Sequence, residues 1–503
     1  MLNLNFSLNS SKERRNNKDY KYSKPIIKSL SIFLIFILYL FIKYVDKKKI
    51  NNNSPLFPVE FKCSNNENLK SLIFEIKNKS NINLTYYNTL YSRNLISSIF
   101  GQNFSFYTLS NCSRKHTLVK LGFSEKRKMG AYNLYVFTVN KENWKKTISK
   151  YIISEYQKIN RYLNYEEFGT KSRLYLNYKE MKNKFSFDYN YMAETYSYPE
   201  DKEEIILKFH NYKFENNLDN LWLLKPKDGA LGKGISILKN ISEINGKYII
   251  TKFFNNPHLI KGSKYDIRFH GLITGVKPMK LYLYKEGFVK ISSVKYNLSN
   301  FNDKFSFITN VGFQKKSKKY KYPKTKEEIK DSNLWNLSIL KEYFSKNGLD
   351  YEKLYEEIKD IFIKMVFSIR KKLIENIEKN NLKNSNFYQL VGFDILLDNN
   401  LKPILLDANE YCALHSDNAA EYYIYNLMID TLNLIGITNV ETNNSHILSK
   451  EQFKKELEYN LCELEKPRGG YTLIFPLKNN IEKYKKFYLN NIPLEDIEFW
   501  KYL

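Results

Sequence analysis

The most regular pattern of apolar and polar positions lies between residues 387 and 410, and it predicts a β-hairpin. Residues 389–397 and 403–408 are rich in β-branched and aromatic side chains, the composition of short strands. The three residues at 398–400, one Asp and two Asn, favour a tight turn because both types tolerate positive φ and hydrogen-bond their own backbone. The chain is therefore expected to fold back on itself here.

This hairpin would gather three oxygen-bearing side chains on one face. Folding about the turn places Asp394 opposite Asp407 or one position away, and Asn409 shares their face. Facing side chains of antiparallel strands lie about 5 Å apart, so two carboxylates there repel each other unless a cation lies between them. Oxygen ligands favour Mg²⁺ over zinc, and a solvated polar face on an edge hairpin is the alternative interpretation. The residues that would point into a core are Val391, Phe393 and Ile395.

A second hairpin is predicted from residue 221 to residue 238. Two short apolar runs flank a loop that contains Gly229, Gly232 and Gly234. Glycine lets a backbone approach a ligand closely, and successive amides can surround phosphate oxygens. The loop leads into a strand, so it matches neither a Walker A loop nor a dinucleotide-binding turn. The pattern favours a lid over a nucleotide, with an ordinary glycine hairpin as the alternative.

Three charged residues, Lys264, Asp266 and Arg268, share one face of a predicted strand that is otherwise apolar. A buried core would not carry such a face. Cations that neutralise phosphate charge, with a carboxylate to fix them, suit a site that handles phosphoryl groups.

The other segments are assigned from their periodicity and composition. Residues 281–284 and 288–292 are expected to pair as a further hairpin. Residues 315–331 are rich in lysine and are expected to form an exposed loop. Helices are predicted over residues 169–181, 335–381 and 418–437.

The N-terminal part of the chain has its own organisation. Residues 1–28 are basic and are expected to be disordered, and residues 46–59 form a linker. The apolar run at 29–45 favours a transmembrane anchor, with a signal-peptide core and a buried or interfacial helix as alternatives. No small-residue cleavage site follows it, which disfavours the signal peptide. Residues 60–163 are expected to form a small α/β domain.

Composition and charge limit the classes of function. Hydrophobic residues make up 43% and aromatic residues 16% of the 503 positions, enough for two or three domains with packed cores. The formal net charge of +27 would attract a polyanion: a nucleic acid, an anionic membrane or an acidic protein segment. A general bias toward Lys and Asn explains part of this charge. No dedicated nucleic-acid-binding signature occurs, and four widely spaced cysteines give neither a disulfide framework nor a zinc site.

Five segments, in the same order, resemble motifs of the tubulin tyrosine ligase-like family. These ATP-grasp enzymes join amino acids to carboxylates on tubulin, and the resemblance covers about residues 164–476. The segments are the Lys-Pro-glycine loop at 225–234, YDIR at 265–268, ITN at 308–310, the hairpin at 389–409, and RGGYTLIFP at 468–476.

The resemblance implies a fold and a division into domains. The implied fold class is α+β, an ATP-grasp fold with a small N-terminal α/β domain and a preceding transmembrane helix. Residues 164–445 would be the catalytic region, with a central lid at 221–254, and residues 446–503 would complete it.

The resemblance also implies ATP and Mg²⁺ as cofactors. Lys171 and Lys225 would bind phosphates, the glycine loop would cover them, and a hinge would meet adenine. The residues implied to bind the nucleotide are Lys171, Lys225, Gly229, Gly232, Gly234, Thr251, Lys252, Phe253, Phe254, Lys264 and Asp266. The residues implied to hold Mg²⁺ are Asp394, Asp407 and Asn409.

The resemblance further implies how the substrates react and which partner the chain acts on. Lys264, Asp266 and Arg268 would handle the γ-phosphate and the acceptor, and Lys285 would face the incoming amino acid. The acceptor carboxylate would become an acylphosphate, which the amine of the amino acid then attacks. The partners would be the acidic tails of tubulin in the cytoplasm, with the catalytic region held at a membrane by residues 29–45. Nucleic acid is not an expected partner.

Some positions differ from the family's pattern. Asp407 stands where the family prefers Glu, and Lys285 replaces an Arg that would grip a carboxylate with two hydrogen bonds. Thr251 and Phe253 replace the usual Gln and Tyr. The ending at 468–470 favours glutamylation over tyrosination, with glycylation as a third option. A membrane-tethered protein that binds microtubules without catalysis is the alternative function.

Overall fold

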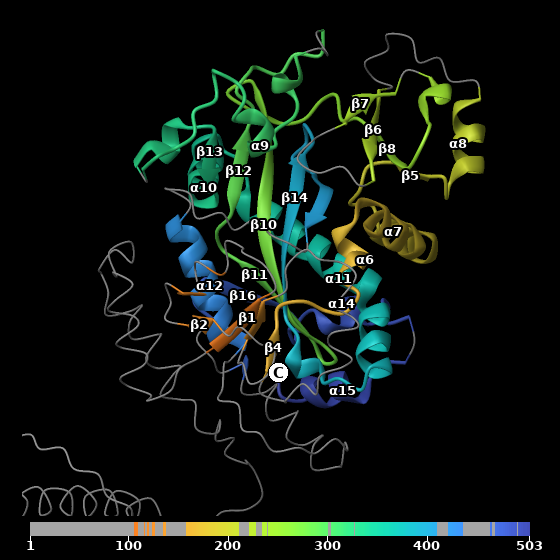
Figure 1. The fold of residues 1–503 in the computed structure, drawn as a ribbon, viewed down its shortest axis with the longest axis vertical. Helices are drawn as coiled ribbons and strands as arrows, with labels where there is room; N and C mark the ends of the chain where they lie inside the picture. The colour runs from red at the N-terminus through yellow and green to blue at the C-terminus, as the bar shows by residue number, and fades with distance from the viewer. Residues whose placement is uncertain are drawn as a thin grey trace, which may run out of the picture. The chain divides into compact units, whose positions relative to one another are not determined.

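The structure is a computed structural model, and Figure 1 shows its fold. It describes residues 157–210, 221–227, 234–238, 240–299, 303–325, 327–409, 421–435, 468–489 and 491–503, with residues 463–464 and short pieces between 105 and 136. The segments predicted over residues 1–59, and both Gly229 and Gly232, lie outside these ranges. Within them, no helix combines the length and the apolar character that crossing a membrane requires.

An eight-stranded antiparallel sheet forms the centre of the fold. Its longest strand pairs with several others along its 14 residues, which alternate between two buried faces. The strands are β9 Leu259–Ile260, β10 Ser263–Val276, β11 Met279–Tyr284, β12 Phe288–Ile291, β13 Leu334–Asn336, β14 Gln389–Leu397, β15 Pro403–Asn409 and β16 Tyr471–Phe475.

The hairpin expected from the most regular pattern is confirmed as strands β14 and β15. β14 begins and ends at the predicted residues, and β15 runs one residue farther than predicted. Val391, Phe393 and Ile395 are fully buried in the main core, as expected. β14 pairs with β10 on its other side, so the hairpin lies inside the sheet along β14.

The prediction that residues 281–284 and 288–292 pair as a further hairpin is wrong. These residues do form strands, β11 and β12, but each pairs with β10 and not with the other. β11 pairs with residues 271–276 of β10, and β12 pairs with residues 265–268 along the same edge of that strand. A long central strand offers enough backbone for two short strands placed end to end, so β11 and β12 need not pair with each other.

Helices cover both faces of the large sheet (Figure 1). α11 Tyr351–Lys379 packs on one face, where Phe362 stacks on Phe393 with ring centroids 5.2 Å apart. α12 Glu421–Ile435 packs on the other, against Leu272 and Tyr282. The other α-helices that the structure describes are α6 Glu166–Gly169, α7 Lys171–Phe185, α8 Lys202–Phe209, α9 Val311–Gln314, α10 Leu337–Lys346, α14 Ile481–Lys485 and α15 Leu494–Trp500.

A smaller antiparallel sheet carries the predicted lid. Its strand order is β5 Thr195–Tyr198, β8 Tyr248–Lys252, β6 Trp222–Pro226 and β7 Ser236–Ile237. β6 and β7 pair as the predicted hairpin, with Leu223 opposite Ile237. Trp222 and Phe209 of α8 form a separate small core on this sheet. The lid therefore has its own packing, apart from the core of the large sheet.

A third sheet precedes both of these. β1 Ser105–Thr108 pairs in parallel with β2 Ser124–Glu125 and β3 Leu134–Val136, and β3 pairs in parallel with β4 Lys158–Ile159. Parallel strands need crossover connections, which is the organisation expected of a small α/β unit. The described part of the chain is thus a mixed α/β fold, and the domain boundaries remain predictions.

Candidate functional site

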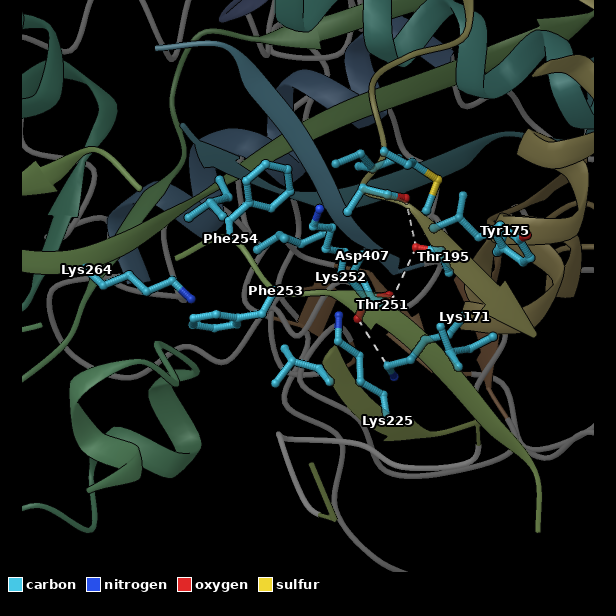
Figure 2. Close-up of a pocket in the computed structure, with 18 residues that line it drawn as sticks. Lys171, Tyr175, Thr195, Lys225, Thr251, Lys252, Phe253, Phe254, Lys264 and Asp407 are labelled. Atoms are coloured by element: carbon cyan, nitrogen blue, oxygen red, sulfur yellow. Dashed lines mark hydrogen bonds and ion pairs between the residues drawn. The ribbon is translucent and has the colours of Figure 1, made fainter. Parts of the chain in front are cut away.

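One pocket lies between the lid sheet, the start of α7 and the β14–β15 hairpin (Figure 2). Its walls come from segments that are far apart in the sequence, including β6, β8, β10 and β15. Leu223, Ile249, Leu405 and other apolar residues give it hydrophobic sides. The predicted site residues that line it are Lys171, Lys225, Thr251, Lys252, Phe253, Phe254, Lys264 and Asp407.

Two lysines enter this pocket from different elements and approach the same carboxylate. Lys171 is the first residue of α7, which begins after Thr170, whose side chain accepts a hydrogen bond from the Arg173 amide. The Lys171 ammonium lies 3.9 Å from Asp407. Lys225 lies near the end of β6, and burial lowers its pKa, as does the charge of Lys171, while Asp407 opposes the shift. Figure 2 shows these three side chains grouped together.

The end of β8 and the residues after it form the inner wall of the pocket. Thr251 pairs across the lid sheet with Thr195, whose hydroxyl donates a hydrogen bond of 3.4 Å to it. The Phe253 amide donates to the Leu221 carbonyl at 2.8 Å, which fixes this segment against β6. The ammonium of Lys264 lies 5.2 Å from the centre of the Phe253 ring. The Phe253 ring could pack against a flat base, and the neighbouring ammonium could bind a phosphate, so this wall suits a nucleotide.

Lys264 is another of the lysines that line the pocket, and burial there disfavours its charged form. Its ammonium donates to the Phe307 carbonyl at 3.1 Å. Burial lowers its pKa to about 8, with a further contribution from the charge of Lys225, and Asp266 opposes the shift. A bound anion would restore the ordinary preference for the charged form.

A charged cluster of four residues lies beside the pocket, on strands β10, β12 and β14. Arg268 donates two hydrogen bonds to Asp394, at 2.6 and 2.9 Å. Lys290 of β12 lies 2.6 Å from Asp266 and 3.0 Å from Asp394. The sheet register accounts for these contacts, because Arg268 pairs with Asp394 and Asp266 pairs with Lys290. Burial works to raise the pKa of Asp394, but Arg268 and Lys290 hold it well below its usual range.

The two carboxylates of the hairpin lie opposite each other, as the sequence predicts. Asp394 pairs in register with Asp407, and a β-bulge follows between Asp394 and Ile395. Burial raises the pKa of Asp407, and the negative charge of Asp394 adds to this, against Lys171 and Lys225. Asp394 is buried and its strand is paired on both sides, so the alternative of a solvated edge face is wrong at this position.

The donor set at the hairpin fits magnesium. Asp394, Asp407 and Asn409 offer carboxylate and amide oxygens, and a cation would stabilise the charged form of half-buried Asp407. Within the described ranges, no group of three or more His, Cys, Asp or Glu residues could hold a metal. Mg²⁺ ordinarily takes one or two carboxylates and completes its shell with waters and phosphates, so a two-carboxylate site is sufficient.

The remaining predicted residues lie outside the pocket lining. Lys285 is exposed at the junction of β11 and β12, and its amide donates to the Gly470 carbonyl at 2.9 Å. Gly234 has a positive φ of 73°, and an added Cβ would lie 2.8 Å from Pro226. The predicted residues that do not line the pocket are Gly234, Asp266, Arg268, Lys285, Asp394 and Asn409.

Sequence reasoning missed residues that complete the site. Lys290 links Asp266 to Asp394, and the hydroxyl of Thr309 hydrogen-bonds to Asp266. The sequence does single out Lys290, because it is the one charged residue between two apolar residues of a short predicted strand. Its partners could not be read from the sequence, since they depend on the pairing of β12 with β10.

Comparisons with known proteins bear on this site. A probable beta-tubulin polyglutamylase of Tetrahymena thermophila is 26% identical over 368 residues, 66% of this chain and 30% of the relative. The tubulin monoglutamylase TTLL4 of Mus musculus is 27% identical, over 69% of this chain and 29% of the relative. The tubulin polyglutamylase TTLL6 of Homo sapiens is 26% identical, over 67% and 40%. The chain thus spans less than half the length of each of these relatives.

The model of the tubulin-tyrosine ligase family matches residues 147–446. The match includes α7, the lid sheet, the charged strands and the β14–β15 hairpin, which together build the pocket and the charged cluster. Because the match covers more than half of the sequence, the chain belongs to the tubulin-tyrosine ligase family.

Proposed function

We propose that the chain is an ATP-dependent ligase that adds an amino acid, glutamate in preference to tyrosine or glycine, to a carboxylate of tubulin. The pocket carries this proposal, because Lys171, Lys225 and Lys264 line it beneath a separate lid sheet, and the Lys171 ammonium lies 3.9 Å from Asp407. Such an arrangement suits the phosphates of a nucleotide. The names of the three relatives, all glutamylases of tubulin, support glutamate and a tubulin acceptor.

The lid and the lysines would bind ATP. Lys171 and Lys225 would neutralise phosphate oxygens, and the wall at residues 251–254 would hold the adenine ring beside Phe253. Lys264 would bind the outermost phosphate, whose negative charge would offset the cost of burying its ammonium. The lid would also exclude water, so that phosphoryl transfer to water is suppressed.

The charged cluster would position the acceptor. Arg268 and Lys290 are fixed by Asp266 and Asp394, and so present cations at a defined place beside the pocket. The acceptor carboxylate would attack the γ-phosphorus, giving an acylphosphate and ADP. The amine of the free amino acid would then attack the acyl carbon, forming an amide and releasing phosphate. Positioning and charge neutralisation are the contributions of the protein.

We assign the Mg²⁺ site to Asp394, Asp407 and Asn409. When bound, the ion would offset the charge of the β- and γ-phosphates. Asp394 would be presented in a fixed, charged state because Arg268 and Lys290 hold it. Asp407 would be the ligand whose charge depends most on the ion.

The test uses the full chain with tubulin, ATP, Mg²⁺ and labelled glutamate, tyrosine or glycine in separate reactions. We expect label from glutamate in tubulin. Lys225→Met should lower the incorporation at least about tenfold, because it removes a cation from the phosphate site. Lys227→Met is the matched control, since Lys227 lies two positions away and pairs with Glu200 outside the pocket. Equal incorporation by the two variants would contradict the assignment of the pocket.

A microtubule-binding protein without ligase activity is the second candidate. Two observations favour it: Lys285 is exposed and outside the pocket lining, and burial favours the neutral form of Asp407. This candidate predicts co-sedimentation with microtubules and no ATP-dependent product from any of the three amino acids. Label in tubulin from one of them would exclude it.

The proposed acceptor places the catalytic region in the cytoplasm, at the cytoskeleton. Anchoring at a membrane by residues 29–45 stays a prediction of the sequence, because the segment lies outside the described residues.

A further inference from the structure

Residues 315–331 form an exposed stretch that we call the lysine segment. It contains eight lysines and three acidic residues, and the prediction of an exposed position is confirmed where the structure describes it. The segment begins directly after α9 and ends shortly before β13. Neither the pocket nor the charged cluster uses any of its side chains.

The first end of the lysine segment is attached to the charged cluster. Thr309, shortly before it, hydrogen-bonds to Asp266. Gln314 is buried, donates to the Phe305 carbonyl at 3.0 Å, and accepts a hydrogen bond of 2.9 Å from the Ser293 amide just beyond β12. The start of the segment is therefore fixed next to the strands that carry the cluster.

The second end is attached to the same strand. The amide of Lys321 donates to the Asn333 side chain at 2.8 Å, and the Asn333 amide donates back to the Lys321 carbonyl at 2.9 Å. The Asn333 side chain also donates to the Ser292 carbonyl at 3.2 Å. The following strand, β13, places Leu334 opposite Lys290 of the cluster. The lysine segment is thus a loop held at both ends beside Asp266 and Lys290.

Five of the lysines that the structure describes in this segment have no ion pair with another described residue. Lys330 pairs with Glu342, and Lys315 lies over the Tyr322 ring. In the parts of the chain that the structure places, no carboxylate lies within ion-pair distance of the other exposed ammonium groups. These belong to Lys316, Lys318, Lys319, Lys321 and Lys324.

One residue of the segment, Tyr320, differs from the lysines because its polar atom is buried. The hydroxyl of Tyr320 is buried and has no hydrogen-bond partner among the residues described. Burial raises the pKa of Tyr320, and the charges of Tyr322 and then Asp266 add smaller contributions. The segment therefore exposes its lysines to solvent and buries the hydroxyl of Tyr320.

We propose that the lysine segment binds an acidic stretch of the acceptor protein, next to the carboxylate that is modified. This inference rests on the proposed function, which places an acceptor carboxylate at the cluster. Unpaired cations beside such a site would attract and orient neighbouring acidic residues. A single-stranded nucleic acid fits less well, because it needs exposed rings for stacking, whereas Tyr320 and Tyr322 are partly buried.

The test measures binding of a fluorescent oligoglutamate peptide to the full chain. We expect Lys318→Glu/Lys319→Glu to raise the Kd of this peptide at least about tenfold. The control is Lys353→Glu/Lys379→Glu, which makes the same change in net charge at exposed positions of α11. Its Kd should change less than about twofold. Equal changes in the two variants would overturn the inference.

Two more measurements separate this inference from the proposed function. If the wild type makes no product but binds the peptide through the lysine segment, the ligase proposal fails and the inference stands. If Lys318→Glu/Lys319→Glu keeps the wild-type KM for tubulin, the inference is overturned and the ligase proposal stands; we expect a higher KM for tubulin and an unchanged KM for ATP. Tighter binding of a single-stranded oligonucleotide than of oligoglutamate by the wild type would also overturn it.

Discussion

Several ionisable side chains of the site lie where burial disfavours their charged form. Lys264 is a buried cation, Lys225 is a half-buried cation, and Asp407 is a half-buried carboxylate that faces another carboxylate. Each charged form becomes favourable when a ligand of opposite charge arrives, because the ligand replaces the water that burial removed. In the free protein, the charges of these three side chains are therefore only partly balanced by neighbouring residues.

Lys264 provides a prediction of pH dependence. Its pKa in the folded protein is about 8, below the ordinary value of 10.5, so the neutral form dominates above 8. Bound phosphate favours the charged form, and nucleotide binding above this pH should therefore take up a proton, with affinity falling as pH rises through about 8. In the free protein the same group makes the free energy of unfolding rise with pH between about 8 and 10.5, since the unfolded state binds more protons there.

Calorimetry of the binding of a non-hydrolysable ATP analogue, which keeps the γ-phosphate, in buffers of different ionisation enthalpy would measure this proton uptake. Lys264→Met should abolish it, whereas Lys304→Met should preserve it, because Lys304 is exposed, lies outside the pocket lining and donates to the Ile235 carbonyl. Uptake that persists in Lys264→Met would assign the titration to another group.

At the scale of elements, the site depends on how short strands share the long strand β10. β11 and β12 pair with β10 end to end, and Gly287 joins them where the chain passes very close to β10. A Cβ at Gly287 would lie 2.2 Å from the Arg268 carbonyl oxygen, which is backbone and cannot rotate away. The close approach sets the register that places Lys290 opposite Asp266.

Gly287→Ala should therefore weaken both the fold and the cluster. We expect a loss of about 3 kcal/mol in the free energy of unfolding, since backbone must move to accept the methyl group. Gly348→Ala is the comparison: it has a positive φ of 66° but nothing within 4 Å of an added Cβ, and should lose roughly 1 kcal/mol. Urea unfolding of both variants measures the difference, and equal losses would refute the role given to Gly287.

At the scale of the whole molecule, the last residues of the chain are joined to its centre. β16 pairs with β11 inside the large sheet. Asp496 of α15 is fully buried and accepts hydrogen bonds from Arg370 of α11 at 2.7 Å, from the Met279 amide at 3.1 Å and from Tyr488 at 2.8 Å. Residues after 468 are thus part of the core that supports the site, and not an appendage.

Asp496→Ala should consequently destabilise the whole fold. It would leave the buried Arg370 without its carboxylate, a change that costs about 3–5 kcal/mol. Lys501→Ala, at an exposed position just after the same helix, should change the free energy of unfolding by less than about 0.5 kcal/mol. Chemical denaturation followed by tryptophan fluorescence measures both, and a single cooperative transition should persist in each.

The sequence alone determined the local elements and the identity of much of the pocket. Alternation and turn chemistry at residues 389–409 are local properties, so the strand bounds and the facing of Asp394 and Asp407 followed from them. The lid hairpin followed from two apolar runs around glycines. The role of each pocket residue, by contrast, came from resemblance to a family, because spacing along the chain does not specify a ligand.

Tertiary structure decided which distant residues meet. Lys171 reaches Asp407 from the start of α7, and Lys290 joins Asp266 to Asp394, only because the strands are paired in one particular register. The sequence predicted a hairpin where β11 and β12 in fact share β10. Local patterns fix which residues form a strand and which face each side chain takes, but a strand's neighbours depend on the competition among all strands for the same backbone groups. The burial, the ion pairs and the pKa of each site residue depend on which strands pair, so local sequence patterns could not predict them.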